Sequence, residues 1–224
     1  MKRRTNGTRK TGVTSSMRNS WTGGEAIRTM ATDGDDLPVA VHRLESGAFE
    51  RLIERYESAL YNYAHRILQN PFDAQEVVQD AFMRAHRALT RQYDETRVAR
   101  LALRPWLFRI VRNLCFNKQR SKKRSTALEE PLHEFDDGRI GPFIARSDHH
   151  DLEKKEELAQ LDRALAALPV EARELIVLRF IEEMSYAEMS KIAGSNEASL
   201  RGKVFRSLKL LRDALDTKGV AHAV

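Results

Sequence analysis

Residues 185–215 constrain the fold most, because their sequence predicts two short helices joined by a tight turn. Ser185 and Glu188 form a Ser-x-x-Glu capping box, which starts a helix. Gly194 supplies the turn, and Ser195 or Asn196 can cap the next helix. Apolar residues on that second helix recur at spacings of four, four, three and four, which predicts one buried face: Leu200, Val204, Leu208, Leu211 and Leu215.

Positive charge gathers on the second of these helices. Its basic residues lie largely off the apolar face: Arg201, Lys203, Arg206, Lys209 and Arg212. A helix that is held down on one side and basic on the other has the form of a helix-turn-helix recognition helix in the major groove of DNA. The segment therefore predicts contact with DNA.

Composition narrows the class of protein. The chain has 224 residues with a formal net charge of +6, so the placement of the charge matters more than its size. Its single cysteine excludes an intramolecular disulfide and fits a reducing compartment. No apolar run approaches the roughly 20 residues of a membrane span. We expect a helical, cytoplasmic protein with no stable membrane insertion.

Changes in composition along the chain predict four segments. Residues 1–38 are polar and basic and are expected to form a disordered extension. Residues 39–124 and 152–224 carry helical periodicity, whereas residues 125–151 are acidic and lack it. The sequence thus predicts an all-α fold of two small helical domains joined by a flexible linker, with the helix-turn-helix in the second.

The first domain is expected to contain three main helices. Apolar residues keep helical spacing from Phe49 to Leu68, and Asn70-Pro71 ends that helix. Asp73 is expected to cap the second helix. A polar stretch follows, and Pro105 suits the first turn of the third helix.

The third helix carries a basic run from Arg104 to Arg124 that contains no acidic residue. Solvated helices usually carry charges of both signs, which pair with each other along the helix. A run that is positive throughout therefore indicates a polyanionic partner. Three aromatic residues, Trp106, Phe108 and Phe116, lie within it and could stack on exposed bases or pack in the core. We expect Trp106 to belong to the core and leave Phe108 open.

Other kinds of site are not predicted. There is no isolated carboxylate pair for acid–base catalysis, no Gly-rich phosphate loop and no nucleophile elbow. None of the scattered histidines stands at metal-ligand spacing from Cys115, which is expected to be a small core residue. We therefore expect no enzyme, no cofactor and no metal.

The ordered set of segments resembles bacterial RNA polymerase sigma factors of the sigma-70 family, and more narrowly their compact extracytoplasmic-function (ECF) class. Three segments of the first domain carry the resemblance: Phe49–Leu68, Asp73–Ala85 and Trp106–Asn117. Two segments of the second domain complete it: Leu165–Pro169 and Met184–Arg212. The resemblance implies a region 2-like domain over residues 39–124 and a region 4-like domain over residues 152–224.

The resemblance also implies partners. The protein would bind the RNA polymerase core enzyme through the β′ clamp and the β subunit, and it would direct transcription initiation from promoter DNA. It would serve a stress or envelope response and be held inactive by an anti-sigma factor.

Site residues follow at the matching positions. Core polymerase binding is implied for Asp73, Glu76, Gln79, Asp80 and Arg84. Reading of the minus-10 element is implied for Arg109, Arg112, Asn113, Asn117 and Arg120. Reading of the minus-35 element is implied for Ser199, Arg201, Lys203, Phe205 and Arg206. The segment Gln92–Leu103 is longer than the usual family loop, so its base-capturing residues stay open.

Two alternatives remain. A helix-turn-helix regulator that is not a polymerase subunit would explain residues 185–215 but not the basic run from Arg104 to Arg124. A nuclease would need clustered carboxylates for metal ions, which the sequence does not show.

Overall fold

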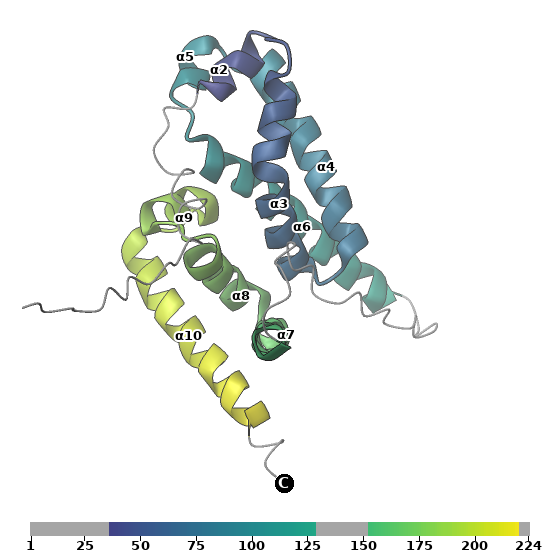
Figure 1. Ribbon diagram of the computed structural model, residues 1–224, viewed down its shortest axis with the longest axis vertical. Helices are drawn as coiled ribbons and strands as arrows, with labels where there is room; N and C mark the ends of the chain where they lie inside the picture. Colours follow the sequence, from purple (N-terminus) through teal and green to yellow (C-terminus); the bar gives the residue numbers. More distant parts are fainter. Residues whose placement is uncertain (1–35, 129–151, 220–224) are drawn as a thin grey trace, which may run out of the picture. The chain divides into compact units, whose positions relative to one another are not determined.

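The computed structural model describes residues 36–128 and 152–219 (Figure 1). The predicted extension up to residue 35, and the predicted linker from residue 129, lie outside the described residues. Helices and connecting turns account for the described ranges, and no strand occurs in them. The predicted all-α class is confirmed. The search for a membrane-spanning helix, made over these same residues, finds none that is long and apolar enough.

The first block of helices begins slightly earlier and ends slightly later than residues 39–124. Its elements are α2 (Leu37–His42), α3 (Ala48–Leu68), α4 (Pro71–Arg87), the π-helical turn η1 (Ala88–Gln92), α5 (Glu95–Ala99) and α6 (Leu103–Leu128). The short helix α5 lies inside the segment expected to be a loop, and Asp94 caps it by accepting from the Arg97 N–H at 2.7 Å. Pro105 falls in the first turn of α6, as predicted.

The expected cap of α4 was wrong. Asn70 caps this helix, and its side chain accepts a hydrogen bond from the backbone N–H of Asp73 at 3.0 Å. The reason is local: the residue before a proline favours extended backbone, which is also what an N-cap needs. Pro71 then takes the first helical position, where its missing N–H costs nothing.

The second block contains the predicted helix-turn-helix. Its elements are α7 (Leu152–Ala167), α8 (Val170–Ile176), the π-helical turn η2 (Val177–Ile181), α9 (Tyr186–Ala193) and α10 (Glu197–Gly219). The capping box of Ser185 and Glu188 is formed, and Gly194 ends α9 with φ +66°. Asn196, one of the two expected caps, accepts from the Ser199 N–H at 2.8 Å.

The predicted apolar face of α10 is correct at three positions and wrong at two. Leu200, Val204 and Leu211 are buried, but Leu208 and Leu215 are 38% and 39% exposed. Ser207 is buried instead and donates to the Lys203 carbonyl at 3.0 Å. Steps of four, three and four keep residues on one side of a 3.6-residue helix, which places position 207 rather than 208 on the buried face.

The buried apolar residues form one main cluster that draws on both blocks. Helix α6 supplies Leu107, Phe108, Val111 and Cys115, and the second block supplies side chains such as Met189. A smaller cluster joins α7, α8 and α10 around Leu165 and Ile176. Helix α6 contacts α3, α4 and α9, so it lies at the centre of the packing.

Candidate nucleic-acid interface

All five residues predicted to read the minus-35 element are exposed on helix α10. Ser199, Arg201, Lys203, Phe205 and Arg206 all face solvent, and Phe205 is 73% exposed. Arg201 is held by Glu197, 3.2 Å away, and lies over the Tyr186 ring at 5.0 Å from its centroid. This pair neutralises the carboxylate of Glu197 near the start of the helix. The face therefore offers cations and one large apolar side chain to a groove.

Helix α6 presents four of its five predicted residues on one face. Arg109, Asn113, Asn117 and Arg120 are exposed at spacings of four, four and three. Arg112 lies off this face and is paired within the protein. Two cations and two amides therefore form a continuous polar strip.

The aromatic residues of α6 differ in their exposure. Phe108 is fully buried, so the option of stacking on bases is wrong for it. Trp106 packs against the core but is only half-buried, so the core prediction holds for part of its ring. Phe116 lies under the Arg112 guanidinium, 4.6 Å from ring centroid to Cζ. Cys115 is buried as expected, and this burial raises the pKa of its thiol to about 12.

The predicted docking face of α4 is charged and mostly exposed. Arg84 pairs with Asp80 one turn earlier at 3.0 Å, and both side chains remain about half exposed. Glu76 and Gln79 are exposed, whereas Asp73 is partly buried. These side chains leave a mixed-charge surface along the helix.

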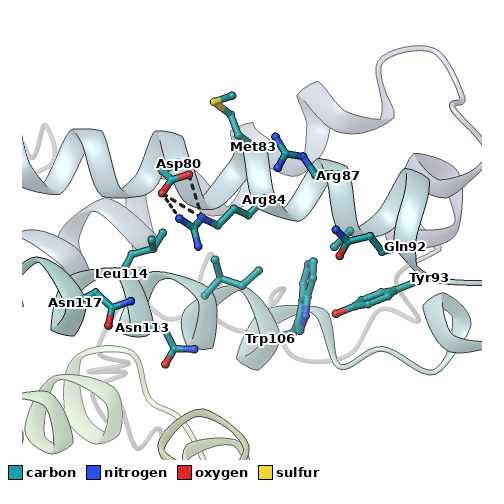
Figure 2. Close-up of a pocket in the computed structure, with 12 residues that line it drawn as sticks. Asp80, Met83, Arg84, Arg87, Gln92, Tyr93, Trp106, Asn113, Leu114 and Asn117 are labelled. Carbon is teal, nitrogen blue, oxygen red and sulfur yellow. Dashed lines mark hydrogen bonds and ion pairs between the residues drawn. The ribbon is translucent and has the colours of Figure 1, made fainter.

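A hollow of about 600 Å³ joins the α4 face to the α6 strip (Figure 2). Asp80 and Arg84 line it from α4, and Asn113 and Asn117 line it from α6. The structure therefore brings together residues that the sequence assigned to two different partners. Sequence reasoning missed other lining residues: Met83, Arg87, Gln92 and Tyr93, with Trp106 across from them.

A second hollow, of about 440 Å³, lies beside the first residues of α6. Arg97, Arg100, Arg109 and Lys191 surround it, together with Trp106. None of these four cations forms an ion pair with another residue in the described part of the chain. Arg97 and Arg100 lie in the segment Gln92–Leu103, whose base-capturing residues the sequence analysis left open. Their positive charge was the only sign in the sequence that they could belong to a nucleic-acid interface.

Arg112 is bound by a buried carboxylate of the second block. Its Nε and Nη2 donate to Glu174 Oε1 and Oε2 at 2.5 and 3.3 Å. The hydroxyl of Tyr63 donates to the same carboxylate at 3.2 Å. Burial raises the pKa of Glu174, against the opposing effects of Arg112 and Tyr63. The adjacent charges of Arg173 and Glu174, inside the apolar stretch of α8, are the local sign of this contact in the sequence.

No group of three or more His, Cys, Asp or Glu side chains that could hold a metal ion occurs in residues 36–128 and 152–219. The α6 strip and the two hollows carry cations, amides and aromatic rings, and Asp80 adds a carboxylate to the first hollow. Such side chains bind phosphates, base edges and base faces, respectively.

Each of the two helical blocks matches the model of a known protein family. The model of Sigma-70 region 2 matches residues 52–125, and that of Sigma-70, region 4 matches residues 158–211. The ECF RNA polymerase sigma factor SigM of Bacillus subtilis is 27% identical over 171 residues, which cover 76% of this chain and 96% of SigM. The ECF RNA polymerase sigma-E factor of Escherichia coli K12 is 29% identical over 188 residues, covering 80% and 92%.

Solved structures agree with these relatives. CnrH, in complex with the cytosolic domain of CnrY, has a TM-score of 0.59 at 26% identity, over 83% of this chain and 99% of that one. The sigma factor RpoE of Bartonella quintana, in complex with the anti-sigma factor NepR, has a TM-score of 0.61 at 22% identity, over 76% and 98%, and supports the fold. Together, the two matched regions and these relatives identify the chain as a member of the ECF class of the sigma-70 family of RNA polymerase sigma factors.

Proposed function

We propose that this sigma factor binds the RNA polymerase core enzyme through α4, holds the minus-10 element with α6 and reads the minus-35 element with α10. The protein directs promoter-specific initiation and leaves the synthesis of RNA to the polymerase. The observation that carries the proposal is the pair of polar faces on α6 and α10, each fixed from behind by the apolar core.

The α6 strip suits a separated DNA strand. Arg109 and Arg120 can neutralise phosphates, while the amides of Asn113 and Asn117 can hydrogen-bond to base edges. Trp106 and Tyr93 lie 5.9 Å apart between ring centroids and give the hollow an aromatic side. Holding unpaired bases on such groups offsets part of the cost of unstacking them.

The α10 face suits duplex DNA. Lys203 and Arg206 can contact phosphates or base edges in the major groove, and the exposed ring of Phe205 can meet a thymine methyl group. The region 4 match over residues 158–211 contains all five predicted residues and supports this role.

For α4 we propose docking on the β′ clamp, with a further contact from the protein to the β subunit. The alternating carboxylates and Arg84 on this helix give it a surface for a charged protein partner. We also propose an anti-sigma partner, since CnrH and RpoE were solved with CnrY and with the anti-sigma factor NepR. The protein would then act in the cytoplasm, where the polymerase is found. It would direct transcription for a stress or envelope response.

In vitro transcription with purified core enzyme and a genomic promoter library tests the proposal. We expect transcripts from a small promoter set only when this protein is added. Transcription that is unchanged by the protein, combined with tight binding of the protein alone to duplex promoter DNA, would favour a helix-turn-helix regulator instead. Cleavage of the template with added divalent metal would point to a nuclease.

A further inference from the structure

We propose that the second hollow, beside the first residues of α6, is a binding site for a free nucleoside polyphosphate. The cations around the hollow hold the phosphate chain, and Trp106 stacks on the base. The proposal goes beyond promoter recognition, because it gives the protein a small-molecule ligand that it binds without the polymerase and without DNA.

The cations around this hollow lack counter-charges. Other cations of α6 are paired: Arg112 with Glu174, and Lys118 with Glu76. Within residues 36–128 and 152–219, no carboxylate pairs with the four cations that line the second hollow: Arg97, Arg100, Arg109 and Lys191. A concave surface lined by charge of one sign concentrates the electric field and attracts ions of the opposite sign. The hollow is therefore suited to an anion.

The carboxylates closest in the sequence already have other partners. Asp94 accepts from the Arg97 backbone N–H as the cap of α5, and Glu95 pairs with Arg43 on α2. On α9, Glu188 forms the capping box with Ser185. None of these acids neutralises the hollow, which leaves its positive charge to a ligand.

An aromatic wall adjoins the cations. The Arg97 guanidinium lies over the Tyr93 ring, 3.7 Å from its centroid, and this cation–π contact leaves the N–H donors at the edge of the guanidinium for a phosphate. The Tyr93 and Trp106 rings lie 5.9 Å apart, side by side in Figure 2. Because Trp106 lines the hollow and is only half-buried, a planar base can stack on it.

Size and charge density favour a free nucleotide over a nucleic-acid strand. The hollow measures about 440 Å³, and sites for small molecules usually span about 300–1,000 Å³. A strand brings one negative charge per nucleotide. A triphosphate chain brings one charge per phosphate and a second on the last, about four in all near pH 7. Four cations around one small hollow match the compact charge.

One consequence rests on the proposed function. Arg109 belongs both to this hollow and to the α6 strip proposed to hold the minus-10 element. A bound nucleotide would therefore occupy a cation that the separated DNA strand needs, and the two ligands would compete.

The test titrates ATP into full-length protein without core enzyme, DNA or divalent metal. The chain has two tryptophans, so a Trp21→Phe background leaves Trp106 as the only tryptophan reporter. We expect ATP to quench its fluorescence with a submillimolar dissociation constant, which isothermal titration calorimetry checks independently.

Variants assign the binding to this hollow. Arg97→Ser with Arg100→Ser should weaken ATP binding at least about tenfold, whereas Arg100→Lys, which keeps the charge, should weaken it less. The matched control, Arg51→Ser with Arg91→Ser, removes two exposed arginines that do not line the hollow and should bind ATP as the parent does. Circular dichroism checks that each variant is folded.

Two further ligands separate the contributions of base, charge and strand. Inorganic tripolyphosphate lacks the base, so it should bind more weakly and leave Trp106 unquenched. An unphosphorylated adenine pentanucleotide carries four phosphate charges along a strand and should bind at least about tenfold more weakly than ATP.

The proposal is overturned if Trp106 is not quenched at about 5 mM ATP, or if the control variant loses as much affinity as the double variant. Tripolyphosphate that binds as well as ATP would show that no base is held. A pentanucleotide that binds as well would make the hollow a strand site. Transcription is not measured in these titrations, so their failure leaves the proposed function standing, and a failed transcription assay leaves the ATP result standing.

Discussion

Lys118 on α6 donates a hydrogen bond to Glu76 on α4 at 2.6 Å, and its ammonium group also lies 3.1 Å from Asp73. Burial lowers the pKa of Lys118, but the hydrogen bonds to these two carboxylates, together with their negative charge, raise it above the usual value. A cation of the basic run is thus tied to the face proposed to dock on the polymerase. Changes at Glu76 act on a surface that α6 helps to position.

Reversal of charge on α4 tests core binding. The double change Glu76→Lys and Asp80→Lys places a lysine beside Lys118 and removes the partner of Arg84. We expect core-enzyme affinity to fall at least about tenfold, since like charges at an interface oppose association. Helicity should stay intact, because both side chains are at the surface and α4 is held by its apolar side. A pull-down with purified core, together with circular dichroism, checks both.

The double change Glu54→Lys and Glu57→Lys is the matched control. It alters the net charge equally at exposed positions of α3. If this control loses core binding to the same degree, the effect is one of overall charge and α4 is not the docking face.

Arg206 on α10 tests promoter reading. Its guanidinium is exposed, so Arg206→Ala should leave the fold unchanged. If the side chain contacts a base edge with two hydrogen bonds, its loss costs about 1–3 kcal/mol, or roughly a 5- to 150-fold drop in promoter use. The drop should appear only on promoters that carry the minus-35 element. Arg212→Ala, an exposed change further along α10, is the control. If promoters without the minus-35 element lose activity equally, Arg206 does not read a base of that element. It would then contact only phosphate or act in another way.

Local signals in the sequence were enough for the long helices and for the ends of α9, but not for the cap of α4 or the short helix α5. Ser185 with Glu188, and Gly194 after α9, act through nearest neighbours, so the sequence alone predicts them. The periodicity of α10 gave the right helix but the wrong face at Leu208. Two successive spacings of four drift the same way around the axis, whereas the spacing of three from Val204 to Ser207 turns back toward the buried face.

Contacts between distant residues could not be predicted in this way. Glu174 and Arg112 are 62 positions apart, and nothing in the local pattern of either one indicates the other. The same holds for the hollow between α4 and α6, which depends on how two helices pack. Candidate site residues can therefore be named from the sequence, but which of them pair inside the protein or line one hollow cannot.

Arg173 tests the contribution of the buried guanidinium to stability. Burial lowers the pKa of this side chain, and its partners are all backbone carbonyls. Arg173→Met keeps much of the volume but leaves those carbonyls without a donor. Each unsatisfied buried group costs about 1–3 kcal/mol, partly relieved by entering water, so we expect a loss of roughly 3 kcal/mol in the free energy of unfolding.

Urea denaturation of the full chain measures that loss. Arg163→Met on α7 removes an exposed arginine from the same block and should change the midpoint little. An Arg173→Met protein as stable as this control would mean that water replaces the guanidinium at those carbonyls.

Glu182 predicts how stability depends on pH. Its burial raises the pKa of the carboxyl from 4.5 to about 7, against the opposing charges of Arg104 and Arg66. Between these values the folded protein holds a proton that the unfolded chain releases, so the free energy of unfolding falls as the pH rises from about 4.5 to 7. The full effect is at most about 3 kcal/mol, since each unit of pKa is worth 1.36 kcal/mol.

Glu182→Gln should be correspondingly less sensitive to pH over this window, as measured by urea unfolding at a series of pH values. Glu183→Gln alters the exposed neighbour and should keep the wild-type profile. Parallel profiles for the wild type and Glu182→Gln would show that this carboxyl titrates as an ordinary surface group.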